Sequence, residues 1–239
     1  MHKTDARWEA GQRPSLELIA KVGALIGDAA KTGAFKGGEG LRPTSQGVRL
    51  AFAPDGERTV TPGPFGGANE LPAAFSIIRA ESLEAAIDWA SEQAAIVGAT
   101  EVDVRPVTEP WDIGIVPEPE GLTSRRYMAV RKATRATESG AEPTPAQRSA
   151  LSALIAKTTG RGVEHLVSET MAPSRRGRRL INSRNGVTMF DGPFLETKEL
   201  LGGFMIMTAA SVDEVATMAE RYIGIVESPE VDIRELVDL

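Results

Sequence analysis

Three acidic side chains stand where acid–base chemistry could be built. Asp191 precedes Gly192-Pro193, so its carboxylate lies at a turn, where we expect it to reach over a cavity as a general base. A carboxylate that only closes an Asx-turn is the alternative. Glu39 and Glu169 lie upstream, and either of them beside Asp191 would raise a pKa by like-charge repulsion and give a catalytic proton-transfer pair. Solvated carboxylates at a strand edge are the alternative for both.

Four basic side chains are candidates for binding an anionic ligand. Lys198, close after Asp191, is expected to neutralise that carboxylate or a bound anion, unless it is a solvated loop lysine. Arg49 and Arg179 each precede a leucine on an expected strand, so they point to the face opposite that leucine. There a guanidinium suits a carboxylate or phenolate ligand, or pairs with a neighbouring glutamate. His2 is a frayed terminus or, if a longer strand precedes it, lies near a cavity mouth.

Composition removes several other kinds of site. The 239-residue chain has no cysteine and two histidines, so thiolate metal sites and a three-histidine site within one chain are excluded. With no nucleotide-binding glycine motif either, we expect no metal and no cofactor. Lys and Arg number 27 against 33 Asp and Glu, a net charge of −6 that disfavours nucleic acid and anionic membranes as partners. Without an apolar leader or span, a cytoplasmic location is expected.

The candidate residues lie within a long internal repeat. Residues 61–107 align with 190–236 without a gap, and 16 of the 47 positions are identical. Upstream, the offset changes from 129 to 130, and residues 39–50 align with 169–180. The change falls at an expected hairpin tip, where insertions are tolerated. We therefore predict two domains, residues 1–116 and 122–239, joined by a Gly- and Pro-rich linker.

The two repeats do not retain the charges equally. Asp191 aligns with Pro62 and Lys198 with Asn69, so only the second repeat carries both groups. We expect one working site, beside a pocket, and one structural half.

The first repeat also begins late. His2 aligns with Lys132 and Thr4 with Thr134, so the partner of an opening strand at 127–130 would lie before Met1. Either this strand is largely lost, or the true start lies upstream.

Each repeat contains the elements of a β-α-β-β-α-β unit with an extra hairpin. Thr144-Pro145-Ala-Gln147 and Ser211-Val-Asp-Glu214 are typical helix starts, with a capping residue followed by Gln or Glu. This order is a ferredoxin-like plan, whose sheet has helices on one face only. The bare faces must be buried, so we predict an α+β fold in which two tandem ferredoxin-like repeats pack sheet to sheet as an intramolecular dimeric α+β barrel. The assembly is then a monomeric pseudo-dimer or a homodimer.

One motif is similar to a known family. Asp191-Gly-Pro-Phe-Leu-Glu-Thr-Lys-Glu199, followed by a Gly-rich strand, resembles the DGPF branch of the YCII-related family. The Glu39-Gly40-Leu41 stretch and the strand ending at Arg105 are also similar, and the resemblance covers both repeats. It implies a dimeric α+β barrel. Members with known activity include a dehydrochlorinase of chlorinated hydroxyquinols, and some DGPF proteins are linked to extracytoplasmic sigma factors. Enzymatic members use a His–Asp pair, whose histidine has no clear counterpart in this sequence.

Two functions remain open. The first is a small-molecule-binding enzyme that acts without a cofactor, as a lyase or isomerase, on a small organic acid or phenolic compound. The second is a noncatalytic ligand-binding or regulatory module in which the same residues hold the ligand. The sequence does not identify the ligand.

Overall fold

Side-chain caps set the starts of the longer helices. Thr144 and Gln147 form the predicted capping box: the Gln147 N–H donates to Thr144 Oγ1, and the Thr144 N–H donates to Gln147 Oε1. Ser82 and Ser211 also accept an N–H from the third residue beyond them. The computed structural model describes residues 1–66, 70–158, 161–194 and 200–237. In this part of the chain the α-helices are α1 (Ala6–Glu9), α2 (Leu16–Lys31), α3 (Leu83–Val97), α4 (Arg135–Glu138), α5 (Pro145–Thr158) and α6 (Val212–Val226).

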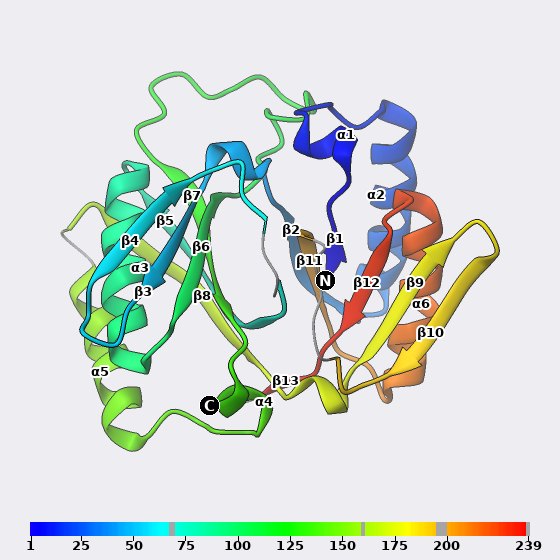
Figure 1. The fold of residues 1–239 in the computed structure, drawn as a ribbon. Helices are drawn as coiled ribbons and strands as arrows, with labels where there is room; N and C mark the ends of the chain where they lie inside the picture. Colours follow the sequence, from blue (N-terminus) through cyan, green and yellow to red (C-terminus); the bar gives the residue numbers. More distant parts are fainter. Residues whose placement is uncertain (67–69, 159–160, 195–199, 238–239) are drawn as a thin grey trace.

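Two antiparallel sheets form the centre of this α+β chain (Figure 1). The seven-stranded sheet has the spatial order β13 (Leu236–Val237), β8 (Val163–Met171), β5 (Pro72–Ala80), β7 (Arg125–Lys132), β6 (Glu101–Pro106), β3 (Val48–Phe52) and β4 (Arg58–Pro62). The six-stranded sheet has the order β10 (Gly186–Asp191), β9 (Arg178–Ser183), β12 (Glu230–Ile233), β1 (His2–Lys3), β11 (Leu201–Met207) and β2 (Phe35–Gly40).

Each sheet draws strands from both predicted repeats, 1–116 and 122–239. The contiguous stretch from β3 to β8 contributes six strands of the seven-stranded sheet. The six-stranded sheet combines β1 and β2 from the start of the chain with β9 to β12 from its end. The opening strand–helix–strand part of each repeat therefore completes the sheet of the other.

The sheets pack face to face, with helices on their outer sides. An apolar cluster between them contains Phe75 and Phe204, which align in the repeat and whose ring centroids lie 4.5 Å apart. A second cluster joins the seven-stranded sheet to α3 and α5 and includes Trp89, and a third joins the six-stranded sheet to α2 and α6. Figure 1 shows α3 and α5 at one side of the molecule and α2 and α6 at the other. The central strands of both sheets thus bury both faces, whereas the edge strands β4 and β10 are exposed.

The retained Gly-Pro-Phe segments are explained by close backbone approach. A Cβ atom on Gly63 would lie 1.8 Å from the carbonyl oxygen of Thr44, and one on Gly192 would lie 1.8 Å from that of Ser174. These contacts place the segment against the turns Thr44–Gln46 and Ser174–Arg176. Only glycine fits at either position.

The opening strands differ in length, and their register corrects one predicted alignment. β1 has two residues, whereas β7 has eight. Lys3 pairs with Leu201 as Lys132 pairs with Pro72. The equivalent of Lys132 is therefore Lys3 and not His2, because the offset returns to 129 at the start of the chain.

Candidate functional site

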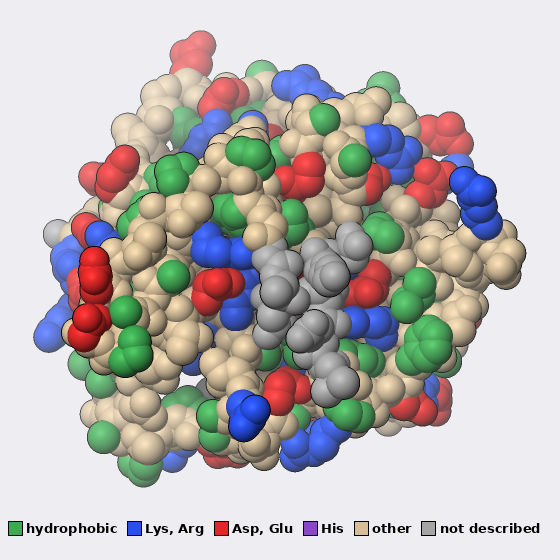
Figure 2. All heavy atoms as spheres, in the orientation of Figure 1, with side chains coloured by type: hydrophobic (Ala, Val, Ile, Leu, Met, Phe, Trp, Pro, Cys, Tyr) green, Lys and Arg blue, Asp and Glu red, His purple; other side chains and the backbone are tan. Residues whose placement is uncertain are grey.

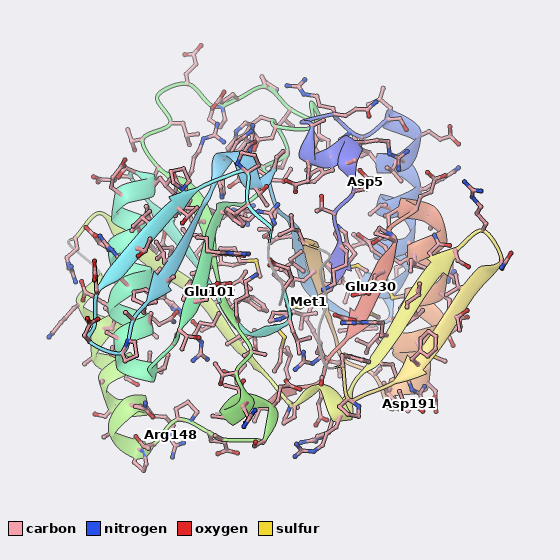
Figure 3. The ribbon with its side chains drawn as sticks, viewed as in Figure 1. Met1, Asp5, Glu101, Arg148, Asp191 and Glu230 are labelled. Carbon is pink, nitrogen blue, oxygen red and sulfur yellow. The ribbon has the colours of Figure 1, made fainter. Side chains whose placement is uncertain are left out.

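Asp191 lies on the surface at the end of β10. Its side chain is 82% exposed, and Oδ1 accepts a hydrogen bond from Arg178 Nε at 2.9 Å. Arg178 also pairs with Asp213 on α6. Figure 3 shows Asp191 at the outer edge of the six-stranded sheet, away from Met1. It is not among the residues that line the two cavities described below. The placement favours a surface ion pair over a base held above a cavity.

The predicted carboxylate pair is not brought together. Glu39 is on β2 and Asp191 on β10, at opposite edges of the six-stranded sheet. Five strand spacings of about 4.8 Å place these strands about 24 Å apart. Glu39 instead accepts a hydrogen bond from Arg126 of β7, which ties the two sheets together. Glu169 is on β8 in the other sheet, opposite Phe75. Lys198 lies outside the described residues.

Arg49 belongs to a buried ionic cluster between β3, β6 and β7. Its Nε lies 2.7 Å from Asp103 Oδ1, and its Nη2 lies 2.8 Å from Glu70 Oε1. Lys132 contacts the same two carboxylates, at 2.6 Å from Asp103 Oδ2. The Arg49 guanidinium also lies over the ring of Phe65, 4.6 Å from its centroid. Glu101 is a third carboxylate, 3.4 Å from Arg49 Nε. Arg49 therefore has protein partners on all of these sides rather than an open anion site.

Arg179 occupies the equivalent cluster in the six-stranded sheet. Its Nε lies 2.7 Å from Asp232 Oδ1, and its guanidinium lies 4.5 Å from the ring centroid of Phe194. Lys3 Nζ lies 3.2 Å from Asp232 Oδ2, so Lys3 takes the part of Lys132. Burial would raise the pKa of Asp232, but the charge of Lys3 and the Arg179 hydrogen bond outweigh it and lower that pKa. Both repeats therefore keep an arginine, a lysine and an aspartate whose ion pairs hold neighbouring strands of the sheet together.

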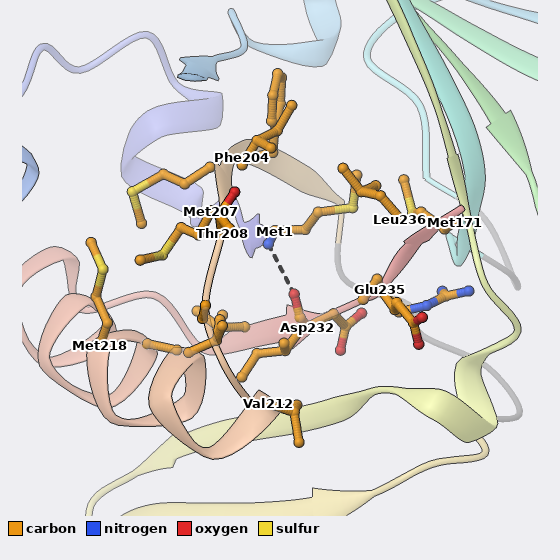
Figure 4. A pocket seen from close by; sticks show the side chains of 18 of the residues that line it. Met1, Met171, Phe204, Met207, Thr208, Val212, Met218, Asp232, Glu235 and Leu236 are labelled. Carbon is orange, nitrogen blue, oxygen red and sulfur yellow. Dashed lines mark hydrogen bonds between the residues drawn. The ribbon is translucent and has the colours of Figure 1, made fainter. Parts of the chain in front are cut away.

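The larger cavity, which we call the apolar slot, opens between β11 and the chain segment around β12. Its volume is about 690 Å³. Figure 4 shows Phe204, Met207 and Met218 on one side and Asp232 and Leu236 on the other. Methionine side chains are flexible, so such walls adapt to what they contact.

His2, predicted to bind ligand, lies in the apolar slot. Its Nδ1 is 3.1 Å from the hydroxyl oxygen of Tyr222 on α6. Burial lowers the pKa of His2 to about 3, and the neighbouring N-terminal amino group and Lys3 act in the same direction. The imidazole is therefore neutral near pH 7 and a weak base. Burial also raises the pKa of the Tyr222 hydroxyl. This pair provides hydrogen bonding within the slot, with little capacity for proton transfer at neutral pH.

The smaller cavity, which we call the polar pocket, was not found by sequence reasoning. It has a volume of about 390 Å³ and lies between the start of the chain and the segment that links β6 to β7. Its walls include Trp8 and Trp111, two of the three tryptophans. A signal was available, because both stand outside the periodic strand and helix patterns. Its charged residues are Arg13, Arg42, Asp112, Glu118 and Arg125.

Three side chains that line the polar pocket each hold a buried polar atom without a hydrogen-bond partner among the described residues. These atoms are Arg42 Nε, Thr108 Oγ1 and Trp111 Nε1. The Asp112 carboxylate pairs with both Arg42 and Arg125. Burial would raise the pKa of Asp112, but the Glu109 N–H and Arg42 outweigh it and lower that pKa. The lining residues therefore combine a fixed carboxylate with N–H and O–H donors that lack an acceptor.

The described residues contain no group of three or more His, Asp or Glu side chains that could hold a metal ion. No helix among them is long and apolar enough to cross a membrane. Figure 2 shows basic and acidic side chains interspersed over one face rather than gathered into a basic surface.

Comparison with known proteins gives one match. Neither the curated proteins nor the solved structures contain a match to this chain. The family model of the YCII-related domain matches residues 126–231, which run from β7 to β12 and so include strands of both sheets. This match supports the resemblance of the second repeat to the YCII-related family, over residues 126–231.

Proposed function

We propose that this chain is a YCII-like, noncatalytic small-molecule-binding protein that holds a small organic acid in the polar pocket. The observation that carries the proposal is the set of three buried polar atoms without a partner, Arg42 Nε, Thr108 Oγ1 and Trp111 Nε1. Leaving such a group unsatisfied costs about 1–3 kcal/mol, so we propose that small side-chain shifts let the acceptor oxygens of a bound ligand reach these donors. A carboxylate or phenolate has acceptors of this kind.

The rest of the pocket suits an aromatic acid. Trp8 and Trp111 provide aromatic surface, and the Trp8 indole is held by its hydrogen bond to the Leu41 carbonyl oxygen. Three arginines against one aspartate and one glutamate give the lining a positive balance. A volume of about 390 Å³ lies within the usual range for small-ligand sites. The acid–base residues expected from the sequence, Asp191, Glu39 and Glu169, do not line this pocket. We therefore propose binding without catalysis.

We also propose that the fold is a DGPF-type pseudo-dimer of two ferredoxin-like units. The central strands run β6-β7-β5-β8 in one sheet and β12-β1-β11-β2 in the other, which are equivalent orders. Each unit takes its first two strands from one repeat and its last two from the other. The Phe75–Phe204 contact supports a pseudo-twofold axis between the sheets. Light scattering should give a mass of one 25.5 kDa chain, and twice that mass would favour a homodimer.

A binding screen tests the proposed ligand class. Benzoate, salicylate and 4-hydroxybenzoate are compared with benzamide by thermal shift and then by calorimetry. We expect an acid to bind and benzamide to bind more weakly. Trp111→Phe keeps an aromatic ring but removes the indole N–H, and Thr108→Val removes the hydroxyl. Each should weaken binding about 5- to 30-fold, the equivalent of about 1–2 kcal/mol.

Thr208→Val is the matched control, because Thr208 lines the apolar slot and not the polar pocket. It should leave the affinity unchanged. Equal affinity in wild type, Trp111→Phe and Thr108→Val would contradict the proposed site.

A further inference from the structure

The apolar slot occupies the place of a strand that is present in the other sheet. In the seven-stranded sheet, β7 lies between β5 and β6 and pairs with both. Ala129 lies opposite Ser76 on one side and Val104 on the other, and Met128 lies opposite Ile77 and Arg105.

The six-stranded sheet repeats this pairing only at its start. His2 lies opposite Gly203 on β11 and Val231 on β12. Met1 continues the ladder: its nitrogen donates to the Asp232 carbonyl oxygen at 2.9 Å, and the Asp232 N–H donates to the Met1 carbonyl oxygen at 2.8 Å. Beyond Met1, no described strand lies between the rest of β11 and the segment that continues β12.

The lining of the slot follows the same register. With the offset of 129, the β5 residues opposite 125–129 correspond to residues 205–209, and the β6 residues opposite 127–129 correspond to 233–235. All eight of these positions line the cavity of about 690 Å³. The slot is therefore a strand position of about five residues, or about 17 Å, bounded by the edges of two strands.

The equivalent strand in the other sheet, β7, shows which side chains would fit in the apolar slot. Ala129 packs toward the helices α3 and α5, Met128 toward the cluster between the sheets, and Tyr127 again toward the helices. In the six-stranded sheet the helix side is lined by Ala219 and Tyr222, and the inter-sheet side by Phe204. A small residue beside Met1, then a large apolar residue, then an aromatic residue would match these walls.

We infer that the apolar slot binds an extended peptide of a partner protein, which adds a strand between β11 and β12. Main-chain hydrogen bonds to both edges supply affinity, and alternate side chains supply specificity. The peptide carries the pattern aromatic–large apolar–small toward its carboxyl end. This site is separate from the polar pocket and does not rest on the function proposed for it.

A peptide that copies residues 124–129, Ser-Arg-Arg-Tyr-Met-Ala, is the probe. It is acetylated, amidated and labelled with a fluorophore, and its anisotropy is measured with the full chain. We expect saturable binding, together with slower amide exchange at residues 205–209 and 233–235. A control peptide with proline in place of Tyr and Ala should bind at least tenfold more weakly, because proline lacks an N–H and cannot complete the ladder.

A chain extended by Arg-Arg-Tyr-Met-Ala before Met1 provides the second measurement. This attached strand should fill the slot, raise the melting temperature and abolish binding of the labelled peptide. Undiminished binding to the extended chain would overturn the inference, because the peptide would then lie elsewhere. No peptide binding to the unextended chain would overturn it too, even if the extension is stabilising, since the slot would then accept only an attached segment. If the chain without peptide had twice the mass of one chain and slow amide exchange at residues 205–209 and 233–235, the slot would be occupied by a second copy of the chain, and the inference would be overturned.

Discussion

Loss of one carboxylate from the Arg49 cluster should destabilise the whole molecule. Glu70 has a side chain that is 1% exposed, and its oxygens accept hydrogen bonds from Arg49 and Lys132. Glu70→Gln removes the charge and turns an amide N–H toward donors that need an acceptor. Arg49 and Lys132 then share Asp103 as their one buried carboxylate, because Glu101, 3.4 Å from Arg49 Nε, has a side chain that is 31% exposed.

The expected magnitude follows from burial. Breaking a buried ion pair by removing one partner costs about 3–5 kcal/mol, because a charge is left without compensation. For a chain of this length, each kcal/mol corresponds to about 2–4 °C, so the melting temperature should fall by about 6–20 °C. Lys132→Met added to Glu70→Gln restores the balance with one cation and one carboxylate. The double variant should regain about 1–3 kcal/mol over Glu70→Gln alone.

Urea unfolding followed by circular dichroism measures these free energies. Glu92→Gln is the matched control: Glu92 lies 2.6 Å from Arg161, but its side chain is 44% exposed. Loss of this surface pair should cost at most about 1 kcal/mol. If Glu70→Gln and Glu92→Gln proved equally stable, and the double variant gained nothing, the argument that the buried charges depend on one another would be refuted.

Three further predictions concern single positions. His2 has a pKa of about 3 in the folded chain and near 6.5 when unfolded, so the unfolded chain binds more protons between these values and stability is lost as the pH falls through them. His2→Gln should reduce that slope by up to about 1.4 kcal/mol per pH unit, as measured by urea unfolding at pH 4.5, 5.5 and 7. Asp191→Asn should change the free energy of unfolding by less than about 1 kcal/mol, since its ion pair is exposed; a larger loss would mean that Asp191 supports more than the hairpin. Gly192→Ala should lower the free energy of unfolding by about 3 kcal/mol, because the new Cβ would collide with the Ser174 carbonyl oxygen. Gly224→Ala, whose Cβ would meet no atom within 4 Å, should not.

Local features of the fold could be predicted because they depend on nearby residues. The capping box at Thr144 and Gln147 requires only a four-residue pattern, and it is present. The exchange of strands between the two sheets could not be predicted from a local sequence pattern. Strands β5 and β11 align in the repeat, so β7 finds a similar partner in either one, and the sequence does not distinguish the two connections.

The candidate site was harder to predict, because its residues depend on partners far away in the sequence. Asp191 was singled out for its motif, but Arg178, part of a run of arginines, holds it at the surface. Strand alternation predicts that Arg49 points to the face opposite Leu50. Its carboxylate partners Glu70 and Asp103 come from separate segments, so this pairing does not follow from the local pattern. The polar pocket combines residues from three segments that no periodic pattern links.

The interleaved sheets impose an order on folding during synthesis. Residues 48–171 emerge as one stretch and contain six of the seven strands of their sheet, so this half can assemble while the chain is still growing. β2 ends at Gly40, but its neighbour β11 does not begin until Leu201. At about 5–20 residues per second, the first forty residues wait about 8–30 s for their partner. During that interval the edge of β2 and the apolar side of α2 are uncovered, and a chaperone or an early aggregate would bind the nascent chain there first.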